Sequence, residues 1–195
     1  MLNQKGTTPF LVPLIIVAAL IGGFFLISKN STNTSEAPSA SPSSSIQWET
    51  YKDEECGYSL KLPKGWTVEN LPIENTKLIK VTAEDKTAFV LIEGIVGPNL
   101  EKEGELEKVI DLLEDKLKKN SNIKINALTR LNENDMSGYL AIGEETYEGK
   151  TVEFEERFIV WKNGRGLRLH GAYSPESKEI NKPITAEIMT SFKTD

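Results

Sequence analysis

Cysteine and histidine are almost absent from this chain. Their scarcity limits the disulfides, zinc sites and histidine- or cysteine-dependent catalytic sites that it could form. Among 195 residues there is one cysteine, Cys56, and one histidine, His170. One cysteine cannot form an internal disulfide, and no Cys/His spacing typical of a zinc site occurs. A Ser-His-Asp or Cys-His catalytic site would have to be built on His170. We therefore expect the fold to be stabilised by packing alone, and we predict Cys56 to be a small, half-buried residue and not a reactive thiol.

Short catalytic and nucleotide-binding motifs are also missing. The sequence contains no G-x-x-x-x-G-K-[ST] loop, no G-x-G-x-x-G turn and no G-x-S-x-G nucleophile elbow. Acidic residues are plentiful, but no pair is marked by its context as the two carboxylates of a glycosidase. We predict that the protein is not an enzyme and binds no cofactor.

The chain also lacks an excess of basic residues. The chain has 23 basic and 29 acidic residues, a net charge of −6. Lys5, Lys29 and Glu36 are the charged residues before position 46, so residues 46–195 carry 21 basic and 28 acidic residues, a net charge of −7. This balance argues against nonspecific binding to nucleic acid.

One long uncharged run, residues 10–27 (FLVPLIIVAALIGGFFLI), stands near the start of the sequence. As a helix it would extend roughly 27 Å, close to a hydrocarbon core of about 30 Å. We predict a single transmembrane helix here, after a short cytoplasmic leader at residues 1–9. A cleaved secretory signal is the alternative, but no small-residue cleavage site follows the run closely. Nor does a cysteine close it, as a lipoprotein signal requires.

Residues 28–45 (SKNSTNTSEAPSASPSSS) are rich in Ser, Thr, Asn and Pro. Such a composition cannot bury enough apolar surface to offset the entropy of ordering, so we predict a disordered linker. Lys5 and the amino terminus give a slight positive bias before the apolar run. We therefore expect a single-pass membrane protein with its amino terminus in the cytoplasm and its large domain, residues 46–195, outside the cytoplasm.

Periodicity in residues 46–195 predicts strands and two helical regions. Strands are expected at 48–51, 58–62, 66–69, 77–83, 87–95, 138–147, 151–161 and 166–173. We expect 58–62 and 66–69 to flank a tight turn at residues 63–65, and 77–83 to pair with 87–95. Apolar residues at helical spacing predict one helix over 102–119. A second begins at Ser174-Pro175, where Ile180, Ile184, Ile188 and Phe192 would share a face and Pro183 would divide or kink the helix.

Asn163-Gly164 is a strong hairpin signal, and as a two-residue loop it fixes the pairing of the flanking strands. The predicted core pairs are Val160 with Leu167, Phe158 with Leu169, Glu156 with Gly171, and Phe154 with Tyr173. The predicted polar face pairs Ile159 with Arg168, Arg157 with His170, and Glu155 with Ala172. Glu156 interrupts the apolar pattern, and we expect its stem to cover Gly171 while its carboxylate reaches the rim.

Arg157, Arg168 and His170 would then cluster on the polar face, where they could contact an anionic group or a partner. Glu153 and Glu155 are close enough to neutralise them, which favours a salt-bridged face, either solvated or covered by a helix, instead. The acidic groups Asp53-Glu54-Glu55 and Glu144-Glu145-Glu148 could bind calcium but lack the spacing of a dedicated loop, which favours surface charge. Trp48, Trp66 and Trp161 are predicted to be core and rim aromatics.

Two segments resemble PsbP-like domains. The first is Trp48-x-x-Tyr51 followed by Gly57-Tyr58-Ser59-Leu60-Lys61-Leu62-Pro63-Lys64-Gly65-Trp66, and the second is the strand ending at Tyr173 with a helix closing in Ser191-Phe192. The resemblance implies an α+β fold in which an antiparallel sheet is covered by helices on both faces. The family has no shared active site, so it implies no catalytic residues. Its photosynthetic members are extrinsic subunits that help to retain calcium and chloride.

These observations together predict a membrane-tethered binding or accessory domain that contacts an unknown protein partner at the cell envelope. Three alternatives remain open. They are an envelope enzyme with an unrecognised site, a carrier of an apolar ligand, and a role like that of a photosystem II extrinsic subunit.

Overall fold

A computed structural model describes residues 46–73, 76–96, 104–133, 136–147, 149–161 and 164–194. Within the chain, Gln47–Asp195 forms one compact unit. The predicted leader, membrane span and linker, residues 1–45, lie outside the described residues and stay predictions. Among the residues that are described, no helix has both the length and the apolar composition needed to cross a membrane.

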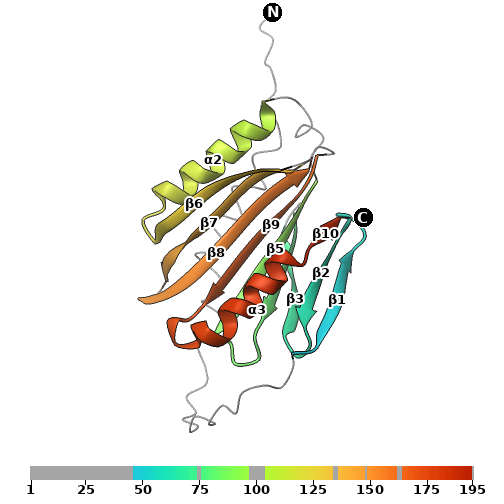
Figure 1. Ribbon diagram of the computed structural model, residues 1–195, viewed down its shortest axis with the longest axis vertical. Helices are drawn as coiled ribbons and strands as arrows, with labels where there is room; N and C mark the ends of the chain where they lie inside the picture. The colour runs from blue at the N-terminus through green and yellow to red at the C-terminus, as the bar shows by residue number, and fades with distance from the viewer. Residues whose placement is uncertain are drawn as a thin grey trace, which may run out of the picture. The chain divides into compact units, whose positions relative to one another are not determined.

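A seven-stranded antiparallel sheet forms the centre of the unit, with strand order β3-β4-β5-β9-β8-β7-β6 (Figure 1). Its strands are β3 (Thr67–Ile73), β4 (Thr76–Thr82), β5 (Ala88–Val96), β6 (Ile123–Glu133), β7 (Met136–Tyr147), β8 (Lys150–Trp161) and β9 (Arg165–Tyr173). The predicted pairing of 77–83 with 87–95 is confirmed as β4 with β5. Strand β6, which the sequence pattern did not predict, forms one edge.

A second, smaller sheet contains β1 (Trp48–Asp53), β2 (Tyr58–Pro63) and β10 (Lys193–Thr194) in the order β1-β2-β10. A tight turn does follow β2, since the amide of Trp66 donates to the carbonyl of Pro63. However, β2 and β3 belong to different sheets and are not paired as neighbours around that turn. The turn therefore carries the chain from one sheet to the other.

Helix α2 (Glu105–Lys119) confirms the predicted amphipathic helix. Its apolar stripe buries Ile110, Leu113 and Leu117. Acidic residues lie in its first turn and three lysines in its last, the arrangement that the helix dipole favours. The helix packs on β6 and β7.

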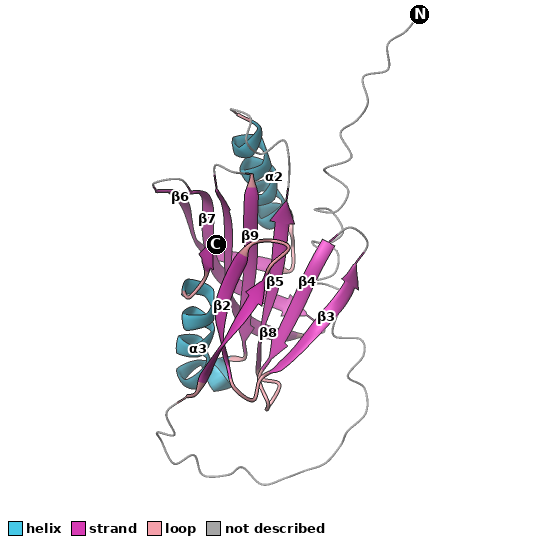
Figure 2. Cartoon of the chain, turned by 90° about the vertical axis from the view of Figure 1, so that its right-hand side faces the viewer, coloured by secondary structure: helices cyan, strands magenta, loops and turns pink. Residues whose placement is uncertain are grey.

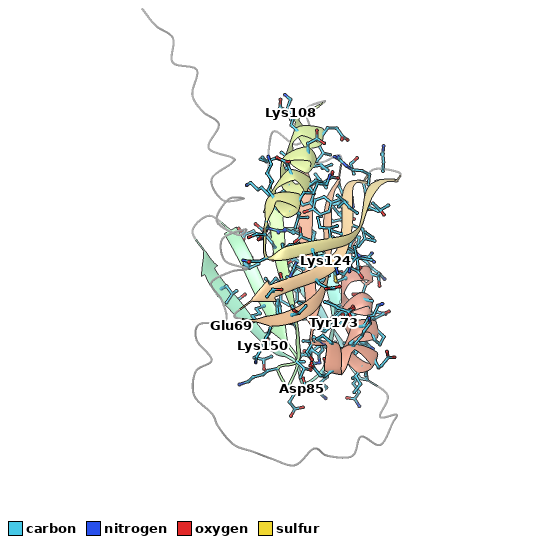
Figure 3. All side chains as sticks on the ribbon, turned by 90° about the vertical axis from the view of Figure 1, so that its left-hand side faces the viewer. Glu69, Asp85, Lys108, Lys124, Lys150 and Tyr173 are labelled. Atoms are coloured by element: carbon cyan, nitrogen blue, oxygen red, sulfur yellow. The ribbon has the colours of Figure 1, made fainter. Side chains whose placement is uncertain are left out.

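A short 3-10 turn, η2 (Pro175–Ser177), leads into α3 (Lys178–Thr190). Ile184 and Ile188 are buried as predicted, but Ile180 is 61% exposed, so the prediction that it shares the buried face is wrong. Pro183 lies inside the helix, which continues to Thr190, so proline does not divide it. Figures 2 and 3 show that α2 and α3 lie on opposite faces of the central sheet.

The main apolar core lies on the α3 face of the central sheet. Residues of β2, β4, β5, β9 and α3 contribute to it: Tyr58, Leu60, Leu62, Ile79, Val81, Val90, Ile92, Leu167, Leu169, Ile184, Ile188 and Met189. Gly171 allows α3 to approach β9, because a Cβ at this position would lie 2.8 Å from the sulfur of Met189. The layers agree with the predicted α+β arrangement of an antiparallel sheet with a helix on each face.

The predicted register of β8 and β9 is wrong by one residue. Phe158 lies opposite Arg168 and Glu156 lies opposite His170. Three residues separate Trp161 from Arg165, and Gly164 has a φ of 75°, as in three-residue hairpin loops that end in a left-handed residue. A shift of one residue moves every side chain of β9 to the other face. Leu167 and Leu169 therefore face α3, and Arg168 and His170 face the side of α2.

Candidate functional site

Strand β9 is buried on both faces, and this places Arg168 and His170 inside the protein. Arg168 is 6% exposed and His170 is 2% exposed. On the neighbouring strand, Glu156 is completely buried, so its carboxylate does not reach the rim as predicted. The three side chains share the sheet face on which Tyr139 of β7 also lies.

Glu156 accepts hydrogen bonds from three directions. Tyr139 donates from its hydroxyl at 2.5 Å, Arg168 donates from Nη2 at 2.9 Å, and Nδ1 of His170 lies at 3.2 Å. Glu145 and Glu93 complete what we call the buried charge cluster: Glu93, Tyr139, Glu145, Glu156, Arg168 and His170. Oε1 of Glu145 is 3.5 Å from Nε2 of His170, and Oε2 of Glu93 is 3.9 Å from Nη1 of Arg168.

The cluster sets the protonation of Glu156 and His170. Burial alone would raise the pKa of Glu156, but the charge of Arg168 and the hydrogen bond with His170 outweigh it and hold this pKa well below its ordinary value. Burial alone would lower the pKa of His170, but Glu145 and Glu156 raise it to about 9. At neutral pH the cluster therefore contains an ionised Glu156 and a protonated His170.

Glu93 behaves differently because its partner is farther away. Burial raises the pKa of Glu93 to about 7, although Arg168 acts to lower it. Its carboxylate lies beyond hydrogen-bonding distance of Arg168, so the attraction does not offset the loss of hydration. Glu93 is thus the carboxyl of the cluster that titrates near neutrality.

The cluster connects strands β5, β7, β8 and β9 beneath the face that carries α2. At the edge of this face, Arg130 of β6 binds α2 through ion pairs with Glu107, Asp111 and Glu114. All of the cluster's carboxylates are less than a tenth exposed. Its geometry suits the stabilisation of one strand arrangement and does not offer a carboxylate or imidazole to a substrate from solution.

Arg157 is separated from the other two predicted site residues. It lies on the opposite sheet face, where Nε contacts Oε1 of Glu155 at 2.8 Å. The prediction that Arg157, Arg168 and His170 form one surface cluster is wrong, because it depended on the two-residue loop. Whether any of them contacts an anion or a partner stays a prediction.

The open sheet face, as we define it, is the α3 side of β6, β7 and β8. Helix α3 packs mainly against β9, β2 and β5, and among the described elements Figure 1 shows no helix in front of β6–β8. The register places a row of Ala127, Ile142 and Glu155 across this face, beside a row of Thr129, Leu140 and Arg157. Ile142 is 40% exposed, an unusual exposure for an isoleucine in the middle of a sheet.

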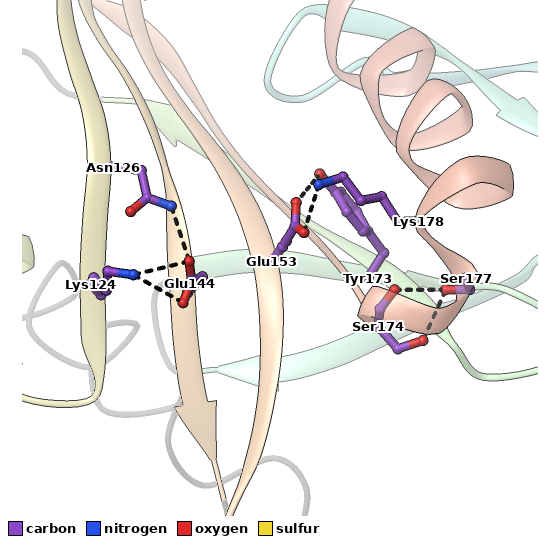
Figure 4. A network of polar contacts seen from close by, with 8 residues as sticks. All are labelled: Lys124, Asn126, Glu144, Glu153, Tyr173, Ser174, Ser177 and Lys178. Carbon is purple, nitrogen blue, oxygen red and sulfur yellow. Dashed lines mark hydrogen bonds and ion pairs between the residues drawn. The ribbon is translucent and has the colours of Figure 1, made fainter.

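Ion pairs lie along one side of this apolar centre. Lys124 of β6 binds Glu144 of β7 at 3.2 Å, and Asn126 donates to the same carboxylate (Figure 4). Lys178 at the start of α3 binds Glu153 of β8 at 2.8 Å. The bonds from Lys124 and Asn126 lower the pKa of Glu144, and the bond to Glu153 raises the pKa of Lys178. The open sheet face therefore combines an exposed apolar centre with fixed charges, the composition of a contact surface.

The acidic groups considered for calcium do not remain together on the surface. Asp53 is buried and accepts the amides of Glu55 and Cys56, while Lys77 lies 3.0 Å from its carboxylate. Glu145 belongs to the buried charge cluster, Glu144 binds Lys124, and Glu148 is outside the described residues. In the described ranges, no group of His, Cys, Asp or Glu has an arrangement that could hold a metal ion.

The aromatic and thiol residues have structural positions. The prediction that Trp48, Trp66 and Trp161 are core and rim aromatics is confirmed, because all three are half-buried and pack against the main core. Cys56 is buried, more deeply than the predicted half. Burial and the nearby Asp53 raise the pKa of its thiol, which keeps it protonated at neutral pH.

The described domain is similar to known proteins in its fold. Neither a protein-family model nor a curated protein matches the sequence. Cyanobacterial PsbP (CyanoP) from Synechocystis sp. PCC 6803 is similar in structure, with a TM-score of 0.58 over 81% of this chain and 98% of that protein, at 9% identity. LpqN of Mycobacterium tuberculosis, which is involved in cell envelope biogenesis, has a TM-score of 0.52 over 77% and 92%, at 13% identity. The described domain therefore has a PsbP-like fold, as the sequence resemblance implied.

Proposed function

We propose that this protein is a membrane-tethered accessory domain that binds a protein partner outside the cytoplasm through its open sheet face. The tether is the apolar run at residues 10–27, and the linker at 28–45 would hold the domain away from the lipid head groups. Similarity in fold to LpqN, a protein involved in cell envelope biogenesis, supports a role at the envelope.

The single observation that carries the proposal is the exposure of Ile142. It lies in the middle of the open sheet face, with Ala127 on one side and the pair Glu155–Arg157 on the other. An apolar centre with a polar rim is typical of protein contacts. The half-buried Leu140 extends the apolar area along β7.

The arrangement of titratable groups disfavours catalysis. His170, which any imidazole-dependent reaction would need, has Glu145 and Glu156 as its two partners and is 2% exposed. Its raised pKa of about 9 also makes it a poor general base at neutral pH. A binding role at the open sheet face does not require His170 or its partners to become exposed or to change protonation.

Co-purification of the full chain tests the proposal. A tagged chain is extracted from membranes with mild detergent, and the proteins that it retains are compared with those retained by Ile142→Arg. We expect Ile142→Arg to lose the retained protein, because a charge would be placed in the apolar centre. Ile180→Arg is the matched control, since Ile180 is also an exposed isoleucine but lies on α3. Equal retention by wild type and both variants would contradict the proposed surface.

The tether has a separate test. If the apolar run is retained as an anchor, the mature protein begins before residue 10 and fractionates with membranes. Amino-terminal sequencing that starts within residues 28–45 would contradict the anchor but leave the binding surface unaffected.

A further inference from the structure

Exposed apolar side chains gather at one end of the domain. Among the residues that the structure describes, the large exposed apolar side chains are Ile46, Val68, Ile142 and Ile180. Ile142 lies on the open sheet face. The other three belong to the end at which the chain enters the domain from residue 45. We call it the entry end and define it by residues 46–48, 63–68, 83–88 and 174–181.

Backbone hydrogen bonds and packing place these segments together. The carbonyl of Gln47 accepts the amide of Lys64 at 2.8 Å, so the start of the domain lies beside the turn that follows β2. Trp66, at the end of that turn, packs against Ala83 and Ala88, which flank the turn between β4 and β5. The entry end is therefore one continuous surface formed by segments that are distant in sequence.

Ile180 reaches the same end from α3. Asn181 donates to the hydroxyl of Thr87 at 2.7 Å, which places the first turn of α3 beside the turn between β4 and β5. Glu187 follows Ile180 by seven residues and so shares its side of the helix, and it binds Nζ of Lys61 at 3.2 Å. Ile180 therefore lies on the side of α3 that faces β2, toward the end of that strand.

The composition of the entry end is that of a membrane–water interface. Trp48 and Trp66 are half-buried there, and tryptophan is enriched at the level of lipid head groups because it combines an apolar ring with one polar group. Exposed charges in the two turns have both signs, with Lys64 and Lys86 accompanied by Glu84 and Asp85. The attraction to a membrane would thus come from apolar side chains and not from a basic patch.

The third tryptophan lies at the other end of the sheet. Trp161 follows Glu153 by eight residues on β8, and Glu153 lies opposite Tyr173, which packs with Trp66. Eight residues of a strand extend about 27 Å. The strands therefore run from the entry end to the opposite end, and Figure 3 shows Asp85 at the first and Lys108 at the second.

We infer that the domain docks on the lipid surface with its entry end, so that Trp48, Trp66 and Ile180 enter the head-group layer. The inference rests on the proposed function, because it takes residues 10–27 as a membrane anchor. As a flexible coil, residues 28–45 would separate their ends by about 24 Å on average, so the domain can both leave the lipid and return to it. Docking would hold the strands upright and present the open sheet face to a partner in the same membrane.

Fluorescence quenching of the full chain in vesicles tests the inference. The chain is reconstituted in phosphatidylcholine whose acyl chains carry bromine near the head group, which quenches a tryptophan only on close approach. The double variant W48F/W161F retains Trp66, and W48F/W66F retains Trp161. We expect Trp66 to be quenched and Trp161 not to be. Absent quenching of Trp66, or equal quenching of both, would overturn the inference.

Two isoleucine variants provide the matched comparison. Ile180→Arg should remove most of the quenching of the wild-type chain, because it places a charge at the entry end, whereas Ile142→Arg should leave it unchanged. Thermal unfolding verifies that both variants are folded. Equal effects of the two would overturn the entry end as the docking surface.

Flotation of the same vesicles separates docking from anchoring. A chain that floats with the vesicles but shows no quenching of Trp66 would overturn docking and leave the proposed function standing. A chain that does not float would overturn the anchor, and docking with it.

Discussion

Two adjacent residues of β8 form ion pairs of nearly equal length on opposite faces of the central sheet. Glu156 binds Arg168 at 2.9 Å beneath the α2 side, and Glu155 binds Arg157 at 2.8 Å on the open sheet face. The side chain of Glu156 is 0% exposed and that of Glu155 is 18% exposed. Distance does not distinguish the pairs, which differ instead in burial and in the further partners of Glu156.

Burial changes what happens when one partner is removed. A buried ion that loses its partner cannot be hydrated, whereas an ion at the surface is solvated by water. On the buried side, Tyr139 and His170 also depend on Glu156. The comparison therefore assigns a structural role to the buried charge cluster and leaves the charges of the open sheet face available for contacts.

The largest expected effect is that of Arg168→Ala. This change leaves Glu156 buried with a weakened set of partners, and we expect the free energy of unfolding to fall by about 3–5 kcal/mol. Arg157→Ala, the matched change on the open sheet face, should cost about 1 kcal/mol or less. Urea denaturation of both variants measures the difference. Equal losses for the two would show that burial does not separate the two faces.

The second prediction uses pH to test the buried side. The pKa of His170 is about 9 in the folded protein and 6.5 for an ordinary histidine, so the folded state binds more protons between these values. Stability from this group is fully present below about pH 6.5 and is lost as pH rises through about 9. Denaturation curves between pH 6 and 9.5 should show this decline, by on the order of 2–3 kcal/mol.

His170→Gln is the control for this decline, since glutamine can still hydrogen-bond to Glu156 but does not titrate. The variant should be less stable at pH 6 and should show a flatter profile above it. A decline of unchanged size in the variant would assign the alkaline loss to another group.

Glu93 gives a third prediction, in a different pH window. Because burial raises its pKa from 4.5 to about 7, the folded state binds more protons in this window and stability falls as pH rises through it. Glu93→Gln should remove this part of the slope and be as stable as the wild type, or more so, at pH 8. Unfolding at pH 5, 6, 7 and 8 measures the slope, and a steeper one in the variant would contradict the prediction.

The sequence predicted the positions of helices and strands more accurately than it predicted which side of the sheet each side chain faces. Alternating patterns placed β4, β5, β7, β8 and β9 correctly, and helical spacing placed α2. Strand β6 was missed because a register shift between Ile125 and Ala127 interrupts the alternation that identifies a strand. Trp66 and the preceding turn suggested a hairpin, but local turn chemistry does not specify which sheet the next strand joins.

The candidate site was harder to predict, for a reason specific to β9. Its sequence alternates Leu167 and Leu169 with Arg168 and His170, which ordinarily indicates one buried and one solvated face. Both faces are in fact buried, one by α3 and one on the side of α2. The loop length alone then decides the register, and Asn163-Gly164 is compatible with either two or three residues. Glu156, the residue that broke the apolar pattern, was the signal that could have indicated a buried charge partner.

The smallest expected effect belongs to Lys124 on the open sheet face. Its bonds to Glu144 are 3.2 and 3.4 Å long, but its own side chain is 70% exposed, so water and salt screen the attraction. We expect Lys124→Ala to change the free energy of unfolding by no more than about 0.5 kcal/mol, and by even less at high salt. Denaturation in low and high salt measures both values. A loss approaching that of Arg168→Ala would mean that the open sheet face also stabilises the fold, and its charges would then no longer be free to serve a partner.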